Sequence, residues 1–191
     1  MKTSEKLFLF DLETTGVKFW KNGIHQIAGA IIIDGEIKEH FDYKVQPNID
    51  AEIEQEALDV GKVTREQIMS YAPMQDIYKQ MVKMLGKYID KFDKFDKIHL
   101  TGYNNAPFDN QFLRAWFKQN GDNYFGSWFW SDSIDVMCLA SNYMRDKRSS
   151  MPNFKQSTVA RELGIQVDES KLHNSKYDTE ILYKIFTAIN S

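Results

Sequence analysis

The chain has 191 residues, of which 42% are hydrophobic, 27% charged and 14% aromatic. This length and aromatic content exclude a disordered or low-complexity chain and predict a single domain over residues 1–191. The 24 Lys and Arg residues and the 27 Asp and Glu residues give a net charge of -3. A strongly basic nucleic-acid binder is therefore not what the composition suggests.

The only cysteine, Cys138, excludes an internal disulfide and fits a reducing compartment, and we expect it to fill the core together with the methionines. No long apolar segment follows residues 1–6, so no secretory signal is expected. The longest apolar run, 27–33, is far shorter than the roughly 20 residues that span a bilayer. We therefore expect a cytoplasmic protein with no membrane partner.

Hydrophobic patterns predict the secondary structure in chain order. We expect strands at 7–10, 24–33 and 36–46, with a two-residue hairpin turn at Asp34 and Gly35. The rest of the pattern predicts a helix after Pro73, a strand at 97–101, a helix after Pro107 capped by Asn104 or Asn105, a weak strand at 129–131, and helices at 134–143, 155–163 and 175–189. A strand meander followed by alternating helices and strands indicates one mixed-sheet α/β domain.

Two acids stand where the first strand ends. Asp11 and Glu13 are two residues apart, so their side chains project to the same face of the strand. Carboxylates placed side by side at the end of a buried strand repel one another unless a cation lies between them. The alternative is a solvent-facing pair, because acidic pairs are common on protein surfaces.

Two more acids each stand at the head of an apolar helix stripe. Asp109 and Asp178 are each followed by apolar residues three, four, seven and eight positions later. The structural alternatives are a helix-dipole contact for Asp109 and a capping box between Ser175 and Asp178. No Lys or Arg occupies matching positions on these faces, and a shared divalent metal site would satisfy all four acids.

His173 lies five residues before Asp178, just outside the expected helix. A lone histidine is more often a surface or structural residue, but beside a metal-binding Asp it becomes a candidate general base. Four oxygen ligands without a Cys/His cluster favour Mg²⁺ or Mn²⁺ over Zn²⁺. Two such ions, about 4 Å apart, can activate a water and stabilise the leaving oxygen of a phosphodiester.

At these residues the sequence resembles the DEDD superfamily of 3′-to-5′ exonucleases. Its first motif resembles residues 10–16, FDLETTG, and its second resembles residues 102–109, GYNNAPFD. His173 with Asp178 resembles the third motif, and Asn174 stands where the tyrosine subclass would have Tyr, so the histidine subclass fits. The GYNN letters and the PNFK segment at 152–155 are similar to the exonuclease I branch, whereas Tyr103 and Gln26 replace the His and Glu of many relatives.

The resemblance implies a ribonuclease-H-like fold, a mixed five-stranded sheet flanked by helices. It also implies metal-dependent release of nucleoside 5′-monophosphates from a 3′ end of single-stranded nucleic acid. Asp11, Glu13 and Asp178 would hold the metal ion of the attacking water, and Asp11 and Asp109 would hold a second ion. His173 would take the proton.

The resemblance also implies substrate contacts. Leu12, Thr14 and Thr15 would cradle the terminal nucleotide, and Asn104 and Phe108 are further candidate contacts. Phe19 and Trp20 either stack on a terminal base or cover an edge of the core. Asp135 is expected to be a helix cap or to support the site without binding metal. A basic cluster before the third motif either contacts the phosphates of the strand or is a solvated surface: Arg145, Lys147, Arg148 and Lys155.

Three functions remain open at this point. The favoured one is a free-standing exonuclease acting on DNA. The alternatives are a proofreading subunit that docks on a DNA polymerase and a short-RNA exoribonuclease, because the motifs do not recognise a 2′-hydroxyl. The last expected helix ends near residue 189, which leaves little tail for docking a polymerase.

Two divalent ions would change the formal charge from -3 to +1, so phosphate attraction should be local to the metals.

Overall fold

The computed structural model describes residues 4–190; residues 1–3 and 191, which the predicted domain includes, lie outside the described part. Five strands form one sheet in the order β3-β2-β1-β4-β5. They are β1 (Lys6–Thr14), β2 (Ile24–Ile33), β3 (Glu36–Lys44), β4 (His99–Gly102) and β5 (Ile134–Asp135). The β1–β2 and β2–β3 pairs are antiparallel, and the β1–β4 and β4–β5 pairs are parallel. The predicted mixed five-stranded sheet is confirmed.

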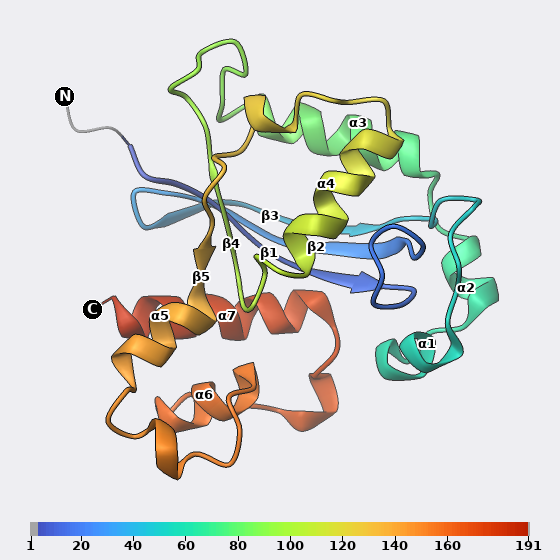
Figure 1. The fold of residues 1–191 in the computed structure, drawn as a ribbon. Helices are drawn as coiled ribbons and strands as arrows, with labels where there is room; N and C mark the ends of the chain where they lie inside the picture. Colours follow the sequence, from blue (N-terminus) through green and yellow to red (C-terminus); the bar gives the residue numbers. More distant parts are fainter. Residues whose placement is uncertain (1–3, 191) are drawn as a thin grey trace.

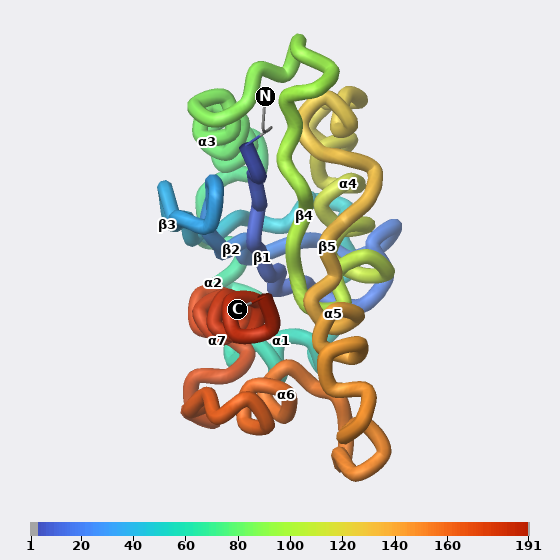
Figure 2. The backbone as a smooth tube through the Cα atoms, turned by 90° about the vertical axis from the view of Figure 1, so that its left-hand side faces the viewer, coloured from blue at the N-terminus to red at the C-terminus, as the bar shows by residue number. Residues whose placement is uncertain are grey.

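Helices cover both faces of this sheet. They are α1 (Gln55–Gly61), α2 (Arg65–Met69), α3 (Met74–Leu85), α4 (Asp109–Gln119), α5 (Val136–Tyr143), α6 (Gln156–Glu162) and α7 (Ser175–Ile189). Figure 1 shows α3 and α4 on one side of the strands and α5, α6 and α7 on the other. The side view in Figure 2 shows the same separation. No helix within residues 4–190 combines the length and the apolar character needed to cross a membrane.

Alternating side chains of β1 divide the core into two layers. Phe8 and Phe10 pack in the cluster that includes α3 and α4, whereas Leu7 and Leu9 pack in the cluster that includes α5, α6 and α7. Because side chains of a strand alternate between faces, Asp11 and Glu13 continue the row of Leu7 and Leu9. The two acids therefore face α7 at the end of a strand whose residues 7–10 are fully buried.

Several sequence predictions hold in detail. The turn between β2 and β3 is formed by Asp34 and Gly35, whose φ angles of 51° and 81° suit a tight hairpin turn. The last helix has the predicted bounds, 175–189. The structure adds α1 and α2, which the sequence did not predict, because each is short and buries a single residue, Leu58 or Ile68.

The predicted edges of several strands were wrong: β1 spans Lys6–Thr14 and not 7–10, and β4 spans His99–Gly102 and not 97–101. The fifth strand lies at 134–135 and not at 129–131, where Phe129 forms only an isolated bridge with Ile98. Phe129 is fully buried in the aromatic core, so its apolar neighbourhood reflects packing rather than strand pairing. The third strand ends at Lys44, two residues before the predicted end.

The predicted cap of α4 was also wrong. Phe108 is the N-cap residue and offers no side-chain hydrogen bond, whereas the Asn105 main-chain carbonyl accepts from the N–H groups of Phe108 and Asn110. Cys138 is exposed on α5 and does not fill the core. The prediction for the methionines holds for Met81 and Met84, which are buried.

Candidate active site

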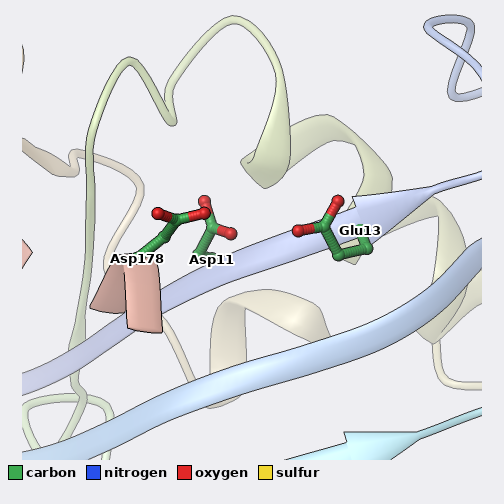
Figure 3. A group of neighbouring side chains, drawn as sticks. All are labelled: Asp11, Glu13 and Asp178. Carbon is green, nitrogen blue, oxygen red and sulfur yellow. The ribbon is translucent and has the colours of Figure 1, made fainter. Parts of the chain in front are cut away.

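Three carboxylates meet at the end of β1. Oxygen atoms of Asp11, Glu13 and Asp178 all lie within 4.8 Å of one another. Figure 3 shows Asp178, at the start of α7, beside Asp11, with Glu13 further along β1. The strand places two of these acids on one face, and the helix that packs on that face supplies the third. The structure thus brings together three of the acids that the sequence singled out.

Asp109, the fourth acid, is the first residue of α4 and is only 6% exposed. Burial raises the pKa of its carboxyl to about 7, although the main-chain N–H groups of Asp109 and Leu12 lower it. Its charge in turn raises the pKa of Asp11, second only to burial among the causes. Asp109 therefore acts electrostatically on the three-acid cluster from the opposite helix layer.

The acids of the cluster destabilise one another's charged forms. Burial, followed by the charges of Asp109, Glu13 and Asp178, raises the pKa of Asp11 well above its ordinary value. Burial and then the charge of Asp178 raise the pKa of Glu13 to about 8. Burial also raises the pKa of Asp178, despite the lowering effect of His173. The charged forms of these carboxyl groups are therefore unfavourable unless a positive charge lies beside them.

A divalent cation fits this arrangement. Within residues 4–190, none of the four acids forms an ion pair with Lys or Arg. Lys44 lowers the pKa of Glu13, but burial and Asp178 raise it more. The fully buried Ser175 hydroxyl lowers the pKa of both Asp11 and Glu13, although it forms no hydrogen bond of ordinary geometry. Oxygen donors that repel one another are a suitable ligand set for a hard divalent ion.

His173 lies in the segment that leads into α7. Its side chain is exposed and its backbone is left-handed, with a φ of 63°. Its main-chain N–H donates a hydrogen bond of 3.0 Å to Oδ2 of Asp178. Asn174 caps α7 by accepting from the N–H groups of Lys176 and Tyr177, so the alternative capping box between Ser175 and Asp178 does not form.

The loop after β1 is fastened by Thr15 and Asn22. The Thr15 hydroxyl donates to the Glu52 carbonyl at 2.7 Å and accepts from the Gly23 N–H at 2.9 Å. Gly16 permits a close approach, because a Cβ at this position would lie 2.4 Å from Nδ2 of Asn22. The hydroxyl of Thr15 is thus engaged within the protein, and the Thr14 hydroxyl donates to the Gly16 carbonyl at 2.8 Å.

The aromatic candidates differ in exposure. Phe19 is half-buried against the core, with its ring centroid 6.5 Å from that of Phe112. Trp20 is 66% exposed and packs edge-on against Phe19, with the centroids 5.0 Å apart. Phe108 is half-buried, 5.0 Å from Phe112, and Leu12 is buried in the same layer. Trp20 is the member of this set that presents its ring to solvent.

Asp135 is a helix cap, as the sequence predicted. It accepts hydrogen bonds from the N–H of Met137 at 2.9 Å, at the start of α5, and from the N–H of Asn104 at 3.0 Å. Asn104 itself is exposed and has a left-handed backbone with a φ of 57°. Asp135 also raises the pKa of Asp109 through its charge, so it links the second motif loop to the acids.

The four basic residues around 145–155 are all exposed: Arg145, Lys147, Arg148 and Lys155. The Arg148 guanidinium lies over the Phe154 ring, 4.6 Å from its centroid. Sequence reasoning missed a different cation, Lys44, which lies outside every motif. The hairpin register could have revealed it, because Glu13 pairs with Gln26 and Gln26 pairs with Lys44.

The fold has solved relatives at low sequence identity. A structure of E. coli Exonuclease I in complex with a dT13 oligonucleotide superposes with a TM-score of 0.76 at 15% identity, over 98% of this chain and 41% of that one. The Exonuclease I of Methylocaldum szegediense gives a TM-score of 0.74 at 16% identity, over 97% of this chain and 40% of that one. These similarities support the fold.

Curated relatives include DNA polymerases. The chain is 24% identical to the PolC-type DNA polymerase III of Mycoplasmopsis pulmonis and 25% identical to that of Mycoplasma genitalium, over 95% and 97% of its length. It spans only 11% of the length of either polymerase. The sequence model of the RNase T exonuclease family matches residues 8–186. The chain therefore belongs to this exonuclease family, within the DEDD superfamily of 3′-to-5′ exonucleases.

Proposed function

We propose that the chain is a metal-dependent 3′-to-5′ exonuclease that hydrolyses phosphodiester bonds at the 3′ end of single-stranded nucleic acid, with DNA as the favoured substrate. Each cleavage releases a nucleoside 5′-monophosphate, and residues 1–191 act as one exonuclease domain. The observation that supports this function best is the cluster of Asp11, Glu13 and Asp178, in a chain that belongs to an exonuclease family.

Four acids are the proposed ligands of two divalent ions, Mg²⁺ or Mn²⁺. Asp11, Glu13 and Asp178 hold one ion, and Asp11 and Asp109 hold the other. When bound, the ions supply positive charge next to the attacking water and the leaving 3′ oxygen. The raised pKa values of Asp11, Glu13 and Asp109 support this assignment, because each reports a buried carboxylate in need of a cation.

His173 is the proposed general base. It accepts a proton from the attacking water and passes it to solvent, which its exposed side chain allows. Its main-chain hydrogen bond to Asp178 ties it to one of the proposed metal ligands. The electron pair of the broken P–O bond stays with the 3′ oxygen of the remaining strand, which takes up a proton.

The terminal nucleotide contacts the end of β1 and the loops around it. Leu12, Thr14 and Thr15 contact it chiefly through main-chain groups, since the hydroxyls of both threonines bond within the protein. Asn104 and Phe108 approach from the second motif, and the exposed ring of Trp20 stacks on a base. The oligonucleotide bound by the E. coli Exonuclease I neighbour supports a single-stranded substrate.

A digestion experiment tests this function. DNA and RNA oligonucleotides of the same sequence, labelled at the 5′ end, are incubated with the protein and Mg²⁺, Mn²⁺ or EDTA. We expect a ladder of products shortened from the 3′ end with either metal and none with EDTA, with DNA cut faster than RNA. Asp11→Asn should abolish the ladder while its circular dichroism spectrum stays unchanged. Products shortened from the 5′ end, or cleavage in EDTA, would exclude the proposed reaction.

The polymerase relatives favour a second candidate, proofreading in association with a DNA polymerase. A proofreading enzyme should remove a mispaired 3′ nucleotide from a primer faster than a paired one, and a polymerase should co-purify with it. Equal rates on both termini and isolation without a polymerase would favour the free-standing enzyme. Faster digestion of short RNA than of DNA would favour the exoribonuclease alternative.

A further inference from the structure

A pocket of about 600 Å³ lies directly beside the candidate active site. Four lysines define it, and we name it the lysine pocket: Lys44, Lys62, Lys171 and Lys176. His173 belongs to its lining, so the pocket adjoins the proposed general base. Residues of α1, α2 and the beginning of α7 line the pocket. Figure 1 shows these three elements at the end of the sheet where β1 ends. Its volume is within the range of small-molecule sites.

The lysine pocket concentrates positive charge in an otherwise acidic chain. Its four lysines come from β3, the turn after α1, the segment before α7 and the first turn of α7. Lys171 pairs with Asp168 at 3.4 Å, but Lys44, Lys62 and Lys176 have no ion pair with any acid among residues 4–190. Glu180 is the one acid of the lining. This charge balance favours an anionic ligand.

The same lining offers groups that suit a nucleobase. Tyr71 and Tyr177 are half-buried there, and Nζ of Lys171 lies 5.8 Å from the centroid of the Tyr177 ring. Gln67 provides an exposed side-chain amide with donors and an acceptor, whereas Gln26 is buried and its amide donates to Oδ1 of Asp42 at 2.7 Å. Lysines for a phosphate, the Tyr71 ring for stacking and the Gln67 amide for a base edge together match a mononucleotide.

The direction of the reaction distinguishes the released nucleotide from the remaining strand. The attacking water and the leaving 3′ oxygen lie roughly in line on opposite sides of the phosphorus. If His173 takes the proton of this water, as the proposed function requires, the remaining strand departs on the side away from the lysine pocket. The oxygen that is newly bonded to phosphorus, and belongs to the released nucleotide, faces His173 and therefore the pocket.

The chemistry also increases the charge of the phosphate that faces the pocket. A phosphodiester has one negative charge, whereas a phosphate monoester has about -1.5 to -2 at neutral pH. The lysines therefore attract the product phosphate more strongly than the intact diester. We propose that the lysine pocket is a product site that binds the phosphate of the released nucleoside 5′-monophosphate.

Equilibrium binding without metal tests this proposal. The full chain is titrated with deoxyadenosine 5′-monophosphate in EDTA by isothermal titration calorimetry. Without cations the carboxyl groups of the active site offer a phosphate no positive charge, so binding reports the lysine pocket. The variant Lys62→Gln/Lys171→Gln should lose at least about tenfold in affinity, because it removes two charges next to a dianion. Both glutamines keep an N–H donor.

Matched controls separate the pocket from the rest of the surface. Lys79→Gln/Lys83→Gln neutralises two exposed lysines of α3 outside the pocket and should leave the affinity unchanged. Lys62 donates a hydrogen bond to the Ser170 carbonyl at 3.4 Å, so Lys171→Gln alone serves as the test if the double variant does not fold. In turnover experiments with metal, inhibition by the monophosphate should weaken by the same factor as binding.

Three results would overturn the proposal. They are an unchanged affinity in the double variant, deoxyadenosine binding as tightly as its monophosphate, and tighter binding of a single-stranded oligonucleotide that is lost in the double variant. The last would assign the pocket to the strand. The titration requires no turnover, so a protein that binds the nucleotide but hydrolyses nothing would contradict the proposed exonuclease and not the pocket.

Discussion

The main-chain N–H of His173 donates a hydrogen bond of 3.0 Å to Oδ2 of Asp178. The proposed base and a proposed metal ligand, five residues apart, are thus joined through a main-chain hydrogen bond where α7 begins. His173 has a φ of 63°, a left-handed conformation that Asn and Gly tolerate better than most residues. Because Asn174 then caps the helix, the beginning of α7 and the position of Asp178 are fixed together.

This connection makes His173→Asn the appropriate test of the base. Asn keeps the left-handed backbone and the N–H that holds Asp178, but it cannot accept the proton of the water. We expect kcat to fall by about 10²- to 10⁴-fold, the usual contribution of a general base. The rise in melting temperature on adding Mg²⁺ should persist, because the metal ligands remain. An unchanged kcat would exclude His173 as the base, and loss of the Mg²⁺ effect would indicate a structural role.

Metal-free protein should lose stability as the pH rises. The pKa values of Glu13 and Asp109 in the folded chain, about 8 and about 7, lie above those of unfolded carboxyls, which are about 4. The folded chain therefore binds more protons than the unfolded chain between about pH 4 and pH 8, and its stability falls across this window. We expect the melting temperature in EDTA to fall by several degrees between pH 5 and pH 8, given about 2–4 °C per kcal/mol for a chain of this size.

Divalent ions and one substitution provide the controls for this pH effect. Mg²⁺ or Mn²⁺ should raise the melting temperature more at pH 8 than at pH 5, because protons compete with the metal for the carboxylates. Asp11→Asn removes one of the repelling charges and should flatten the pH dependence in EDTA. A melting temperature that rises from pH 5 to pH 8 in EDTA would contradict the electrostatic account of the site.

Much of the site was predictable because its acids follow local patterns. Asp11 and Glu13 share a face through strand alternation, and Asp109 and Asp178 head buried helix stripes, so spacing alone indicated four inward-facing carboxylates. Convergence of three of them within 4.8 Å depends on which helix covers which face. The order of the motifs, through the family resemblance, predicted that the acids share one site. Local hydrophobic periodicity could not predict which helix covers which face.

The features that the sequence did not predict depend on tertiary packing. Phe129 belongs to an apolar segment that looked like a strand, but it is buried among core aromatics and β5 begins only at Ile134. The cap of α4 was misassigned because the main-chain carbonyl of Asn105, and not its side chain, accepts hydrogen bonds from the N–H groups of Phe108 and Asn110. Lys44 reaches the site through strand register, which requires the pairing of both hairpins.

Trp20 and Phe19 should respond differently to substitution, because one ring is exposed and the other packs on the core. Trp20→Ala should raise KM for a single-stranded oligonucleotide by about 5- to 150-fold, since stacking of one base is worth about 1–3 kcal/mol. Its melting temperature should stay close to that of the wild type. Steady-state kinetics and thermal unfolding of the same preparation measure both effects.

Phe19→Ala provides the contrast. It removes a half-buried ring next to Phe112 and should lower the free energy of unfolding by about 1–3 kcal/mol, less than for a fully buried Phe. Trp20→Phe, which keeps an aromatic face, should restore most of the oligonucleotide affinity. If Trp20→Ala destabilises the fold and leaves KM unchanged, the ring covers the core edge instead of binding a base.

Asp135 allows its capping role to be separated from its electrostatic effect on Asp109. Asp135→Ala removes the acceptor for the N–H groups of Met137 and Asn104, and loss of an N-cap costs about 0.5–2 kcal/mol of stability. Asp135→Asn keeps a side-chain oxygen acceptor and removes only the charge that raises the pKa of Asp109. We therefore expect thermal unfolding to show a loss of stability for Asp135→Ala but little for Asp135→Asn, and both variants to retain metal-dependent cleavage. If Asp135→Asn abolishes cleavage in the labelled-oligonucleotide assay as completely as Asp109→Asn does, Asp135 is itself a metal ligand and not only a cap.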